Sequence, residues 1–205
     1  CETAIADSEV EYWDETDPSI FVKFPVAGRE NEYLVIWTTT PWTLPANVAV
    51  AVNPAFTYAR VKAKKDDAEE VLWIADELVE PVLKMGRYQD YTVLERVSGS
   101  DLVGTEYISP LAGCVPHQAE IRHRVVEADY VALENTGLVH IAPGHGWDDY
   151  LVGIREGLEA FCPVDAGGCF TPAAGVFADM YVRDANDVVI DALGGYLLAR
   201  RTITH

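Results

Sequence analysis

The chain has 205 residues, of which 49% are hydrophobic and 23% charged, an ordinary globular composition with enough apolar residues for a core. Its formal net charge of −18, from 33 acidic and 15 basic residues, argues against a general nucleic-acid-binding surface, because phosphate binding requires clustered Lys and Arg. No apolar run approaches the about 20 residues that cross a bilayer, and no signal-peptide pattern opens the chain.

The first part of the chain predicts a series of short strands, because runs of β-branched and aromatic residues alternate with turn-forming Gly, Asn and Pro. The predicted strands in this part cover residues 20–26, 33–38, 48–52, 57–62 and 71–74. Asp76 is a suitable cap for a short helix that runs to about Leu83, with Pro81 limiting its regularity.

The second part predicts further strands at residues 91–97, 122–130 and 137–142, and two helices. One helix begins at Asp148 or Asp149, and the last runs from Asp184 or Ala185 to Arg200. The stretch 162–175 is rich in Gly and Pro and predicts a long loop. The residues expected on the inner faces of the two helices are Leu151, Val152, Ile154 and Leu158 in the first, and Val188, Val189, Ala192, Leu193 and Leu197 in the second. Many strands with few helices indicate an α+β fold, with a β-barrel-like core of mostly antiparallel strands and peripheral helices.

Four cysteines, at positions 1, 114, 162 and 169, form no C-x-x-C pair, so we expect no disulfide framework. Free buried thiols are expected at Cys114, Cys162 and Cys169. Cys1 would be half of a metal-binding knuckle, which nothing inside the chain completes. Since the first residue is Cys1 rather than Met, we expect a segment of a longer protein. We attribute the acidic surplus to solubility, with a salt-adapted host as the alternative.

The most informative segment is Trp-Thr-Thr-Thr-Pro-Trp-Thr-Leu-Pro at residues 37–45. A strand cannot continue through Pro41 in the middle of a sheet, so the chain must turn there. Thr38, Thr39 and Thr40 bring three hydroxyls to that turn, and Trp37 and Trp42 can shield it from water. The alternative is an ordinary strand end whose tryptophans serve core packing.

A second segment, residues 136–150, combines a strand ending near His140, a glycine-rich loop and two carboxylates at a helix start. A carboxylate in this position is favoured by the helix dipole and suits capture of a cationic amino group, although capping is the usual role of Asp148 and Asp149. His145 is interpreted as structural or solvent-facing. The glycines at 144 and 146 do not form a dinucleotide fingerprint, and neither metal-ligand spacing nor a serine-hydrolase elbow is present.

Together the two segments resemble the editing domain of class I aminoacyl-tRNA synthetases for branched aliphatic amino acids. The run from Thr38 to Asn47 is similar to the threonine-rich peptide of the isoleucyl members, whereas the valyl and leucyl members carry an Arg near the third Thr and an acidic residue near Trp42. Residues 137–150 resemble the second editing motif of the family, and Cys1-Glu2-Thr3-Ala4 resembles the start of the inserted domain. The resemblance covers residues 1–205, which we therefore interpret as a single editing domain.

The resemblance also implies roles for individual residues. Asp149 is expected to pair with the substrate's α-ammonium, which leaves Asp148 to the helix cap or the loop. His140 is expected to border the side-chain pocket, where positioning and size exclusion are favoured over general-base catalysis. Thr38, Thr39 and Thr40 are expected to bind the terminal adenosine, the ester or the attacking water, with Thr39 grouped with His140 and Asp149 as catalytic. Trp37 and Trp42 are expected to shape the pocket.

The activity that the resemblance implies is a cytoplasmic aminoacyl-tRNA deacylase. It would hydrolyse valine from the acceptor end of tRNA(Ile), and would help to clear valyl-adenylate. The implied partners are that acceptor end and the remainder of the synthetase chain, with a monomeric domain, no membrane and no cofactor or metal in this segment; zinc is expected elsewhere in the synthetase. Two alternatives stay open: a non-catalytic module that docks the acceptor end, and a stand-alone hydrolase of small aminoacyl esters.

Overall fold

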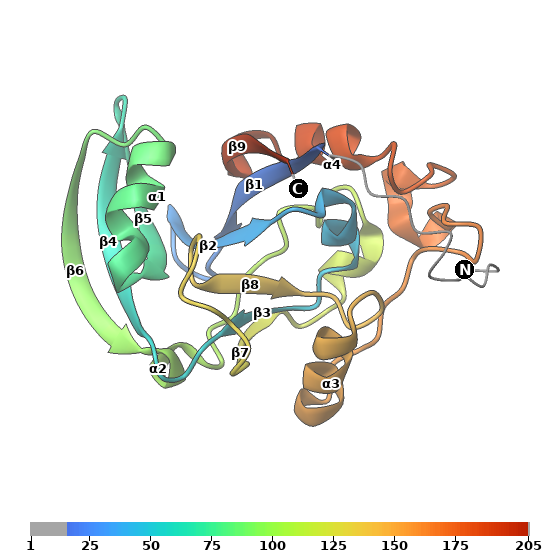
Figure 1. Ribbon diagram of the computed structural model, residues 1–205, viewed down its shortest axis with the longest axis horizontal. Coiled ribbons are helices and arrows are strands. Elements are labelled where there is room, and N and C mark those ends of the chain that lie inside the picture. Colours follow the sequence, from blue (N-terminus) through green and yellow to red (C-terminus); the bar gives the residue numbers. More distant parts are fainter. Residues whose placement is uncertain (1–15, 205) are drawn as a thin grey trace.

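The computed structural model describes residues 16–204, in which strands predominate (Figure 1). The strands are β1 (Thr16–Pro25), β2 (Glu32–Thr38), β3 (Ala49–Val52), β4 (Thr57–Lys65), β5 (Ala68–Ala75), β6 (Asp90–Ser98), β7 (Arg124–Glu127), β8 (Leu138–Ile141) and β9 (Leu197–Thr204). The α-helices are α1 (Val79–Met85), α2 (Gly99–Leu102), α3 (Trp147–Glu156) and α4 (Asn186–Leu193). Short 3₁₀ helices are η2 (Pro41–Ala46), η3 (Asp76–Leu78), η4 (Pro116–Ala119), η5 (Pro172–Phe177) and η6 (Gly194–Tyr196).

The strands form one curled sheet in the order β6-β4-β5-β2-β8-β3-β7, to which β1 and β9 are added through β2. Five of the eight strand pairings are antiparallel, and those of β2 with β5, β2 with β8 and β3 with β7 are parallel. Figure 1 shows the helices at the periphery, with α1 beside β4 and β5 and with α3 and α4 at opposite margins of the sheet. The predicted α+β class with a barrel-like, mostly antiparallel core is confirmed.

The pairing of β8 with two neighbours brings the two informative segments together. On one side β8 runs parallel to β2, with Trp37 opposite Val139. On the other side it runs antiparallel to β3, with Val50 opposite His140. Because β2 ends and β3 begins at the edge where β8 ends, the connection between them must cross the end of β8. That connection is the threonine-rich turn.

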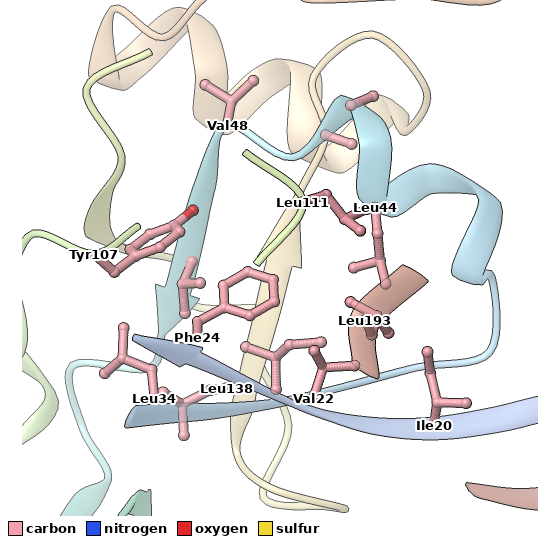
Figure 2. Packing of buried hydrophobic residues seen from close by; sticks show 14 of the residues in the cluster. Ile20, Val22, Phe24, Leu34, Leu44, Val48, Tyr107, Leu111, Leu138 and Leu193 are labelled. Atoms are coloured by element: carbon pink, nitrogen blue, oxygen red, sulfur yellow. The ribbon is translucent and has the colours of Figure 1, made fainter. Parts of the chain in front are cut away.

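The turn itself is rigid because its apolar residues are buried. Pro41 occupies the first turn of η2, where its missing N–H is not needed, and Pro45 lies inside the same short helix. Leu44 is fully buried, which stabilises the turn by about 1.5–3 kcal/mol relative to an exposed side chain. Figure 2 shows Leu44 in the main hydrophobic cluster together with Leu111 and Leu193. The polar part of the turn is thereby held in one position relative to β8.

The prediction of one last helix up to Arg200 is wrong. The helix α4 ends at Leu193, and Gly194 adopts φ 50°, a left-handed value that glycine tolerates and that interrupts the helix. The chain then continues as β9, which pairs antiparallel with β1 and places Arg200 opposite Ile20. Val188, expected on the inner face, is exposed.

Four smaller expectations also need correction. Leu151 and Ile154 of α3 are exposed, because this helix packs on the sheet mainly through Val152. The strand expected at 122–130 is limited to β7, and the expected loop at 162–175 already contains the start of η5. Cys162 is exposed, and Cys114 and Cys169 are half-buried, so these three free thiols are not buried as predicted. Cys1 lies outside the described residues.

Among the helices of residues 16–204, none combines the length and the apolar composition of a membrane span.

Candidate functional site

A pocket of about 360 Å³ lies where the threonine-rich turn crosses the end of β8. We call it the Thr–His pocket. All seven residues that the sequence analysis selected line this pocket, and five further residues complete the wall. The selected residues are Trp37, Thr38, Thr39, Thr40, Trp42, His140 and Asp149, and the others are Thr43, Val139, Ala142, His145 and Gly146. Segments about 100 positions apart in the chain therefore share one cavity.

The threonine hydroxyls of the turn differ in what they contact. Thr38 Oγ1 accepts a hydrogen bond from the backbone N–H of Thr40 at 3.1 Å and lies 3.2 Å from Thr40 Oγ1. Thr43 Oγ1 donates to the carbonyl oxygen of Thr40 at 2.8 Å. Among the described residues, the hydroxyl of Thr39 has no hydrogen-bond partner, although its side chain is half-buried in the pocket wall. Thr39 is therefore the hydroxyl most available to a ligand.

His140 is held by the same network. Its Nε2 lies 2.9 Å from Thr43 Oγ1, and because the Thr43 hydrogen is already donated to a carbonyl, the imidazole must donate this bond. A neutral His140 then carries its proton on Nε2 and a lone pair on Nδ1, which is buried without a partner in the described part of the chain. Burial lowers the pKa of His140 to about 4, outweighing the opposite effect of nearby Asp149. His140 is consequently neutral at physiological pH.

Asp149 reaches the pocket from the first turn of α3, whose N-cap is Gly146. Its Oδ2 accepts the backbone N–H of Ala142 at 2.9 Å, and its Oδ1 accepts the hydroxyl of Tyr130 at 2.7 Å. A carboxylate offers about four acceptor positions, so roughly two stay available to a cationic ligand. Asp148 is exposed in the same turn and does not line the pocket, which leaves Asp149 as the carboxylate of the pocket.

The tryptophans differ in how they are fixed. Trp37 donates its indole N–H to Ser19 Oγ at 2.8 Å, so its ring enters the pocket wall in a defined orientation. The backbone N–H of Trp42 donates to Asn186 Oδ1 at 3.1 Å, which ties η2 to α4. The ring of Trp42 meets that of His145 edge to face, with centroids 5.2 Å apart. Both rings narrow the apolar part of the cavity.

Sequence reasoning assigned no site role to Thr43, Tyr130 or His145. His145 was interpreted as structural or solvent-facing, but it lines the pocket, its Nε2 is buried without a partner among residues 16–204, and burial lowers its pKa. The only sequence signal for these residues was their position within or near the two segments. A Cβ at Gly144 would lie 2.5 Å from the carbonyl oxygen of Phe161, so glycine at this position permits close packing of two loops.

Within residues 16–204, no group of three His, Cys, Asp or Glu side chains is placed to hold a metal ion. The site instead combines a fixed anionic carboxylate, a neutral imidazole and an available hydroxyl around a partly apolar cavity. Such a set can hold a small cationic molecule with an apolar side chain and can order a water molecule beside it.

No protein-family model matches the chain. Over its whole length the chain is 91% identical to an isoleucine–tRNA ligase from Methanoculleus marisnigri, 68% identical to one from Methanocorpusculum labreanum and 64% identical to one from Methanospirillum hungatei. The chain spans 19% of the length of each of these relatives.

Among solved structures, the fold is similar to GlLeuRS-CP1, with a TM-score of 0.63 and 16% sequence identity, over 85% of this chain and 94% of that one. It is also similar to the editing domain of the P. falciparum cytosolic leucyl-tRNA synthetase, with a TM-score of 0.53 and 12% identity, over 68% of this chain and 66% of that one. At such low identity the likeness concerns the fold alone.

Proposed function

The chain corresponds to one segment of isoleucine–tRNA ligase and has the fold of a class I synthetase editing domain, and we propose from this premise that it hydrolyses the ester of valyl-tRNA(Ile). Isoleucine and valine differ by one methylene, and a binding pocket distinguishes two such ligands by only about 1–3 kcal/mol. A second, hydrolytic site is therefore needed to remove valine that has been attached in error. The observation that carries the proposal is the meeting of Asp149, His140 and Thr39 around one pocket of about 360 Å³.

Asp149 binds the α-ammonium of the substrate amino acid. Its two hydrogen bonds, from the Ala142 amide and the Tyr130 hydroxyl, fix the carboxylate at the pocket wall while leaving acceptor positions for an N–H donor. A charge-assisted hydrogen bond between ammonium and carboxylate orients the amino acid with its ester toward the threonine-rich turn.

His140 limits the size of the amino-acid side chain. Its ring cannot swing away freely, because Nε2 is bonded to Thr43 and the residue is buried beneath the turn. An imidazole whose pKa lies near 4 accepts a proton weakly at neutral pH, so His140 acts mainly by shape and position. The isopropyl group of valine fits the space beside the ring, and the longer side chain of isoleucine is excluded.

Thr39 supplies the hydroxyl that contacts the terminal ribose, the ester or the attacking water. Thr38, Thr40 and Thr43 already bond to one another or to the backbone, and they hold the turn in shape. An aminoacyl ester is intrinsically reactive, so an ordered water in the correct orientation accounts for much of the acceleration. The same pocket would accept valyl-adenylate, which carries the same amino acid.

The test is to incubate the protein with valyl-tRNA(Ile) and isoleucyl-tRNA(Ile) and to measure the release of each amino acid. We expect rapid release of valine and little release of isoleucine. Binding of the acceptor end without release of valine would instead indicate a docking module. Hydrolysis of free valyl esters at the same rate as valyl-tRNA(Ile) would indicate a general esterase of small substrates.

A further inference from the structure

A second, larger pocket of about 780 Å³ adjoins the Thr–His pocket. We call it the polar pocket. The two share Thr39, Thr40 and Trp42 as lining residues. The rest of the polar pocket comes from β1, from β9 and from the start of α4 with the residues before it, which contribute Arg183, Asp184, Asn186, Asp187 and Arg200. The two cavities therefore meet at the same turn.

The polar pocket has the chemistry of a nucleotide site. Two guanidinium groups can bind phosphate oxygens, and the carboxylates and the amide can bind ribose hydroxyls and base edges. Its volume is within the range of about 300–1,000 Å³ that small-ligand sites occupy. Because the chain as a whole carries a net charge of −18, a phosphate can be bound here only through local arginines.

Arg200 is the cation best defined by its contacts. It donates from Nη2 to Asp187 Oδ1 at 2.8 Å, and both side chains are substantially exposed, at 46% and 74%. An exposed pair of this kind contributes little to folding. A phosphate can therefore engage the guanidinium without unfolding the surrounding strand.

Asn186 connects this pocket to the Thr–His pocket. It uses Oδ1 to accept the Trp42 amide, so the two Nδ2 hydrogens are its remaining donors toward a ligand. The same bond fixes the backbone of Trp42, a residue that lines both cavities. Another pocket, beside α3, is lined by Tyr130, Asp148 and Arg155 among others, and it shares no lining residue with the Thr–His pocket. It is therefore less suited than the polar pocket to a ligand that extends out of the Thr–His pocket.

We propose that the polar pocket binds the nucleotide that precedes the terminal adenosine of the acceptor end, with Arg200 contacting the phosphodiester between the two. The proposal rests on the proposed deacylase function. An ester held in the Thr–His pocket is attached to a polynucleotide that must leave the cavity, and the polar pocket begins at the three residues that form the shared wall.

The test compares two substrates of different length: the valyl ester of adenosine, and the valyl ester of cytidylyl-adenosine, the last two nucleotides of every tRNA. We expect the wild-type protein to prefer the longer ester by about tenfold in kcat/KM, as for one charge-assisted contact, and Arg200→Gln to abolish most of that preference. Arg200→Lys should retain part of it. The matched control is Arg122→Gln, which breaks an exposed ion pair with Glu106 outside both pockets.

A binding measurement separates failure of this inference from failure of the deacylase function. Cytidylyl-adenosine and adenosine, both without an amino acid, are titrated calorimetrically into the wild-type and Arg200→Gln proteins at several salt concentrations. Loss of one phosphate contact should make the dependence of log affinity on log salt shallower by about 0.7. If neither ester is hydrolysed but this difference appears, the polar pocket binds nucleotides and the deacylase proposal is wrong.

The inference is overturned if adenosine and cytidylyl-adenosine bind equally well to the wild-type protein. It is also overturned if Arg122→Gln reduces the preference for the longer ligand as much as Arg200→Gln does, because the effect would then reflect overall charge. Circular dichroism and thermal unfolding of Arg200→Gln, compared with Arg200→Lys, establish that the variant is folded.

Discussion

Thr43 Oγ1 lies 2.9 Å from His140 Nε2, although 97 positions separate the two residues in the chain. The contact exists because β8 lies between β2 and β3, so that the link from β2 to β3 must pass over the end of β8. The Thr43 hydroxyl, which accepts the hydrogen bond from the imidazole, itself donates a hydrogen bond to the carbonyl oxygen of Thr40. One buried bond thus fixes both the tautomer and the orientation of His140.

Thr43→Val should release the His140 ring while preserving the volume of residue 43. We expect the preference for valyl over isoleucyl ester to fall by about tenfold, and the free energy of unfolding to fall by about 1–3 kcal/mol because a buried N–H loses its acceptor. Thr43→Ser retains the hydroxyl and should behave nearly like the wild type. Deacylation of both esters and urea denaturation measure the two effects; equal behaviour of the Val and Ser variants would exclude the hydroxyl from this role.

Asp149→Ala should lower kcat/KM for valyl-tRNA(Ile) by about 100-fold, the loss expected when a charge-assisted contact worth about 3 kcal/mol disappears. Asp148→Ala is the matched control, since it removes a neighbouring carboxylate of the same helical turn that is exposed. We expect the control to stay within about twofold of the wild type. Similar rates for the two variants would show that Asp149 does not hold the ammonium group.

His140→Ala should enlarge the pocket on the side where the ring limits the substrate. We expect isoleucyl-tRNA(Ile) to become a substrate, with its kcat/KM approaching that for the valyl ester. The measurement is the ratio of the two values in one preparation, which does not depend on the fraction of active protein. His117→Ala removes an imidazole that pairs with Glu159 outside the pocket and serves as control. An unchanged ratio in His140→Ala would mean that another residue sets the size limit.

The two segments that line the site could be read from the sequence because each is local: a proline ends a strand, and a carboxylate follows a glycine-rich loop. The roles of Thr43 and His145 could not be predicted from the sequence, because they depend on which strands flank β8. Strand order is a non-local property. The same limit explains the error at the C-terminal end. Along residues 197–204, apolar and polar side chains alternate too weakly for the sequence to distinguish a helix from a strand. The segment forms a strand because it pairs with the edge of β1.

Asn47 is expected to matter for stability rather than chemistry. It is fully buried at the end of η2, where Nδ2 donates to the carbonyl of Ala49 at 2.9 Å and Oδ1 accepts the hydroxyl of Tyr107 at 2.6 Å. Asn47→Ala should cost about 3 kcal/mol, since the Tyr107 hydroxyl loses its buried acceptor. The double variant Asn47→Ala/Tyr107→Phe should cost less than the sum of the single changes. Strict additivity in urea denaturation would show that the bond contributes nothing.

The stability of the protein should fall as the pH decreases from about 6.5 toward 4, and His140 should account for part of the fall. The pKa of His140 is lowered to about 4 in the folded protein, whereas an unfolded chain has the ordinary value near 6.5. Between these values the unfolded state binds a proton that the folded state resists, so acidification favours unfolding. Burial also lowers the pKa of His123, which adds to the loss of stability in acid. The pKa of His117 is raised, mainly by its hydrogen bond with Glu159, and this effect opposes the loss.

The contribution of His140 can be isolated by comparison with His140→Gln, which cannot titrate. Urea denaturation at pH 7.0, 6.0, 5.0 and 4.5 should show the wild type losing stability relative to the variant by at most about 1.4 kcal/mol per pH unit, the limit for one proton. The contributions of His117 and His123 are common to both proteins and cancel in the difference, whereas Asp149 and His145 interact with His140 and contribute to the difference together with it. Parallel pH profiles would mean that His140 keeps an ordinary pKa in the folded protein, and would return it to consideration as a general base.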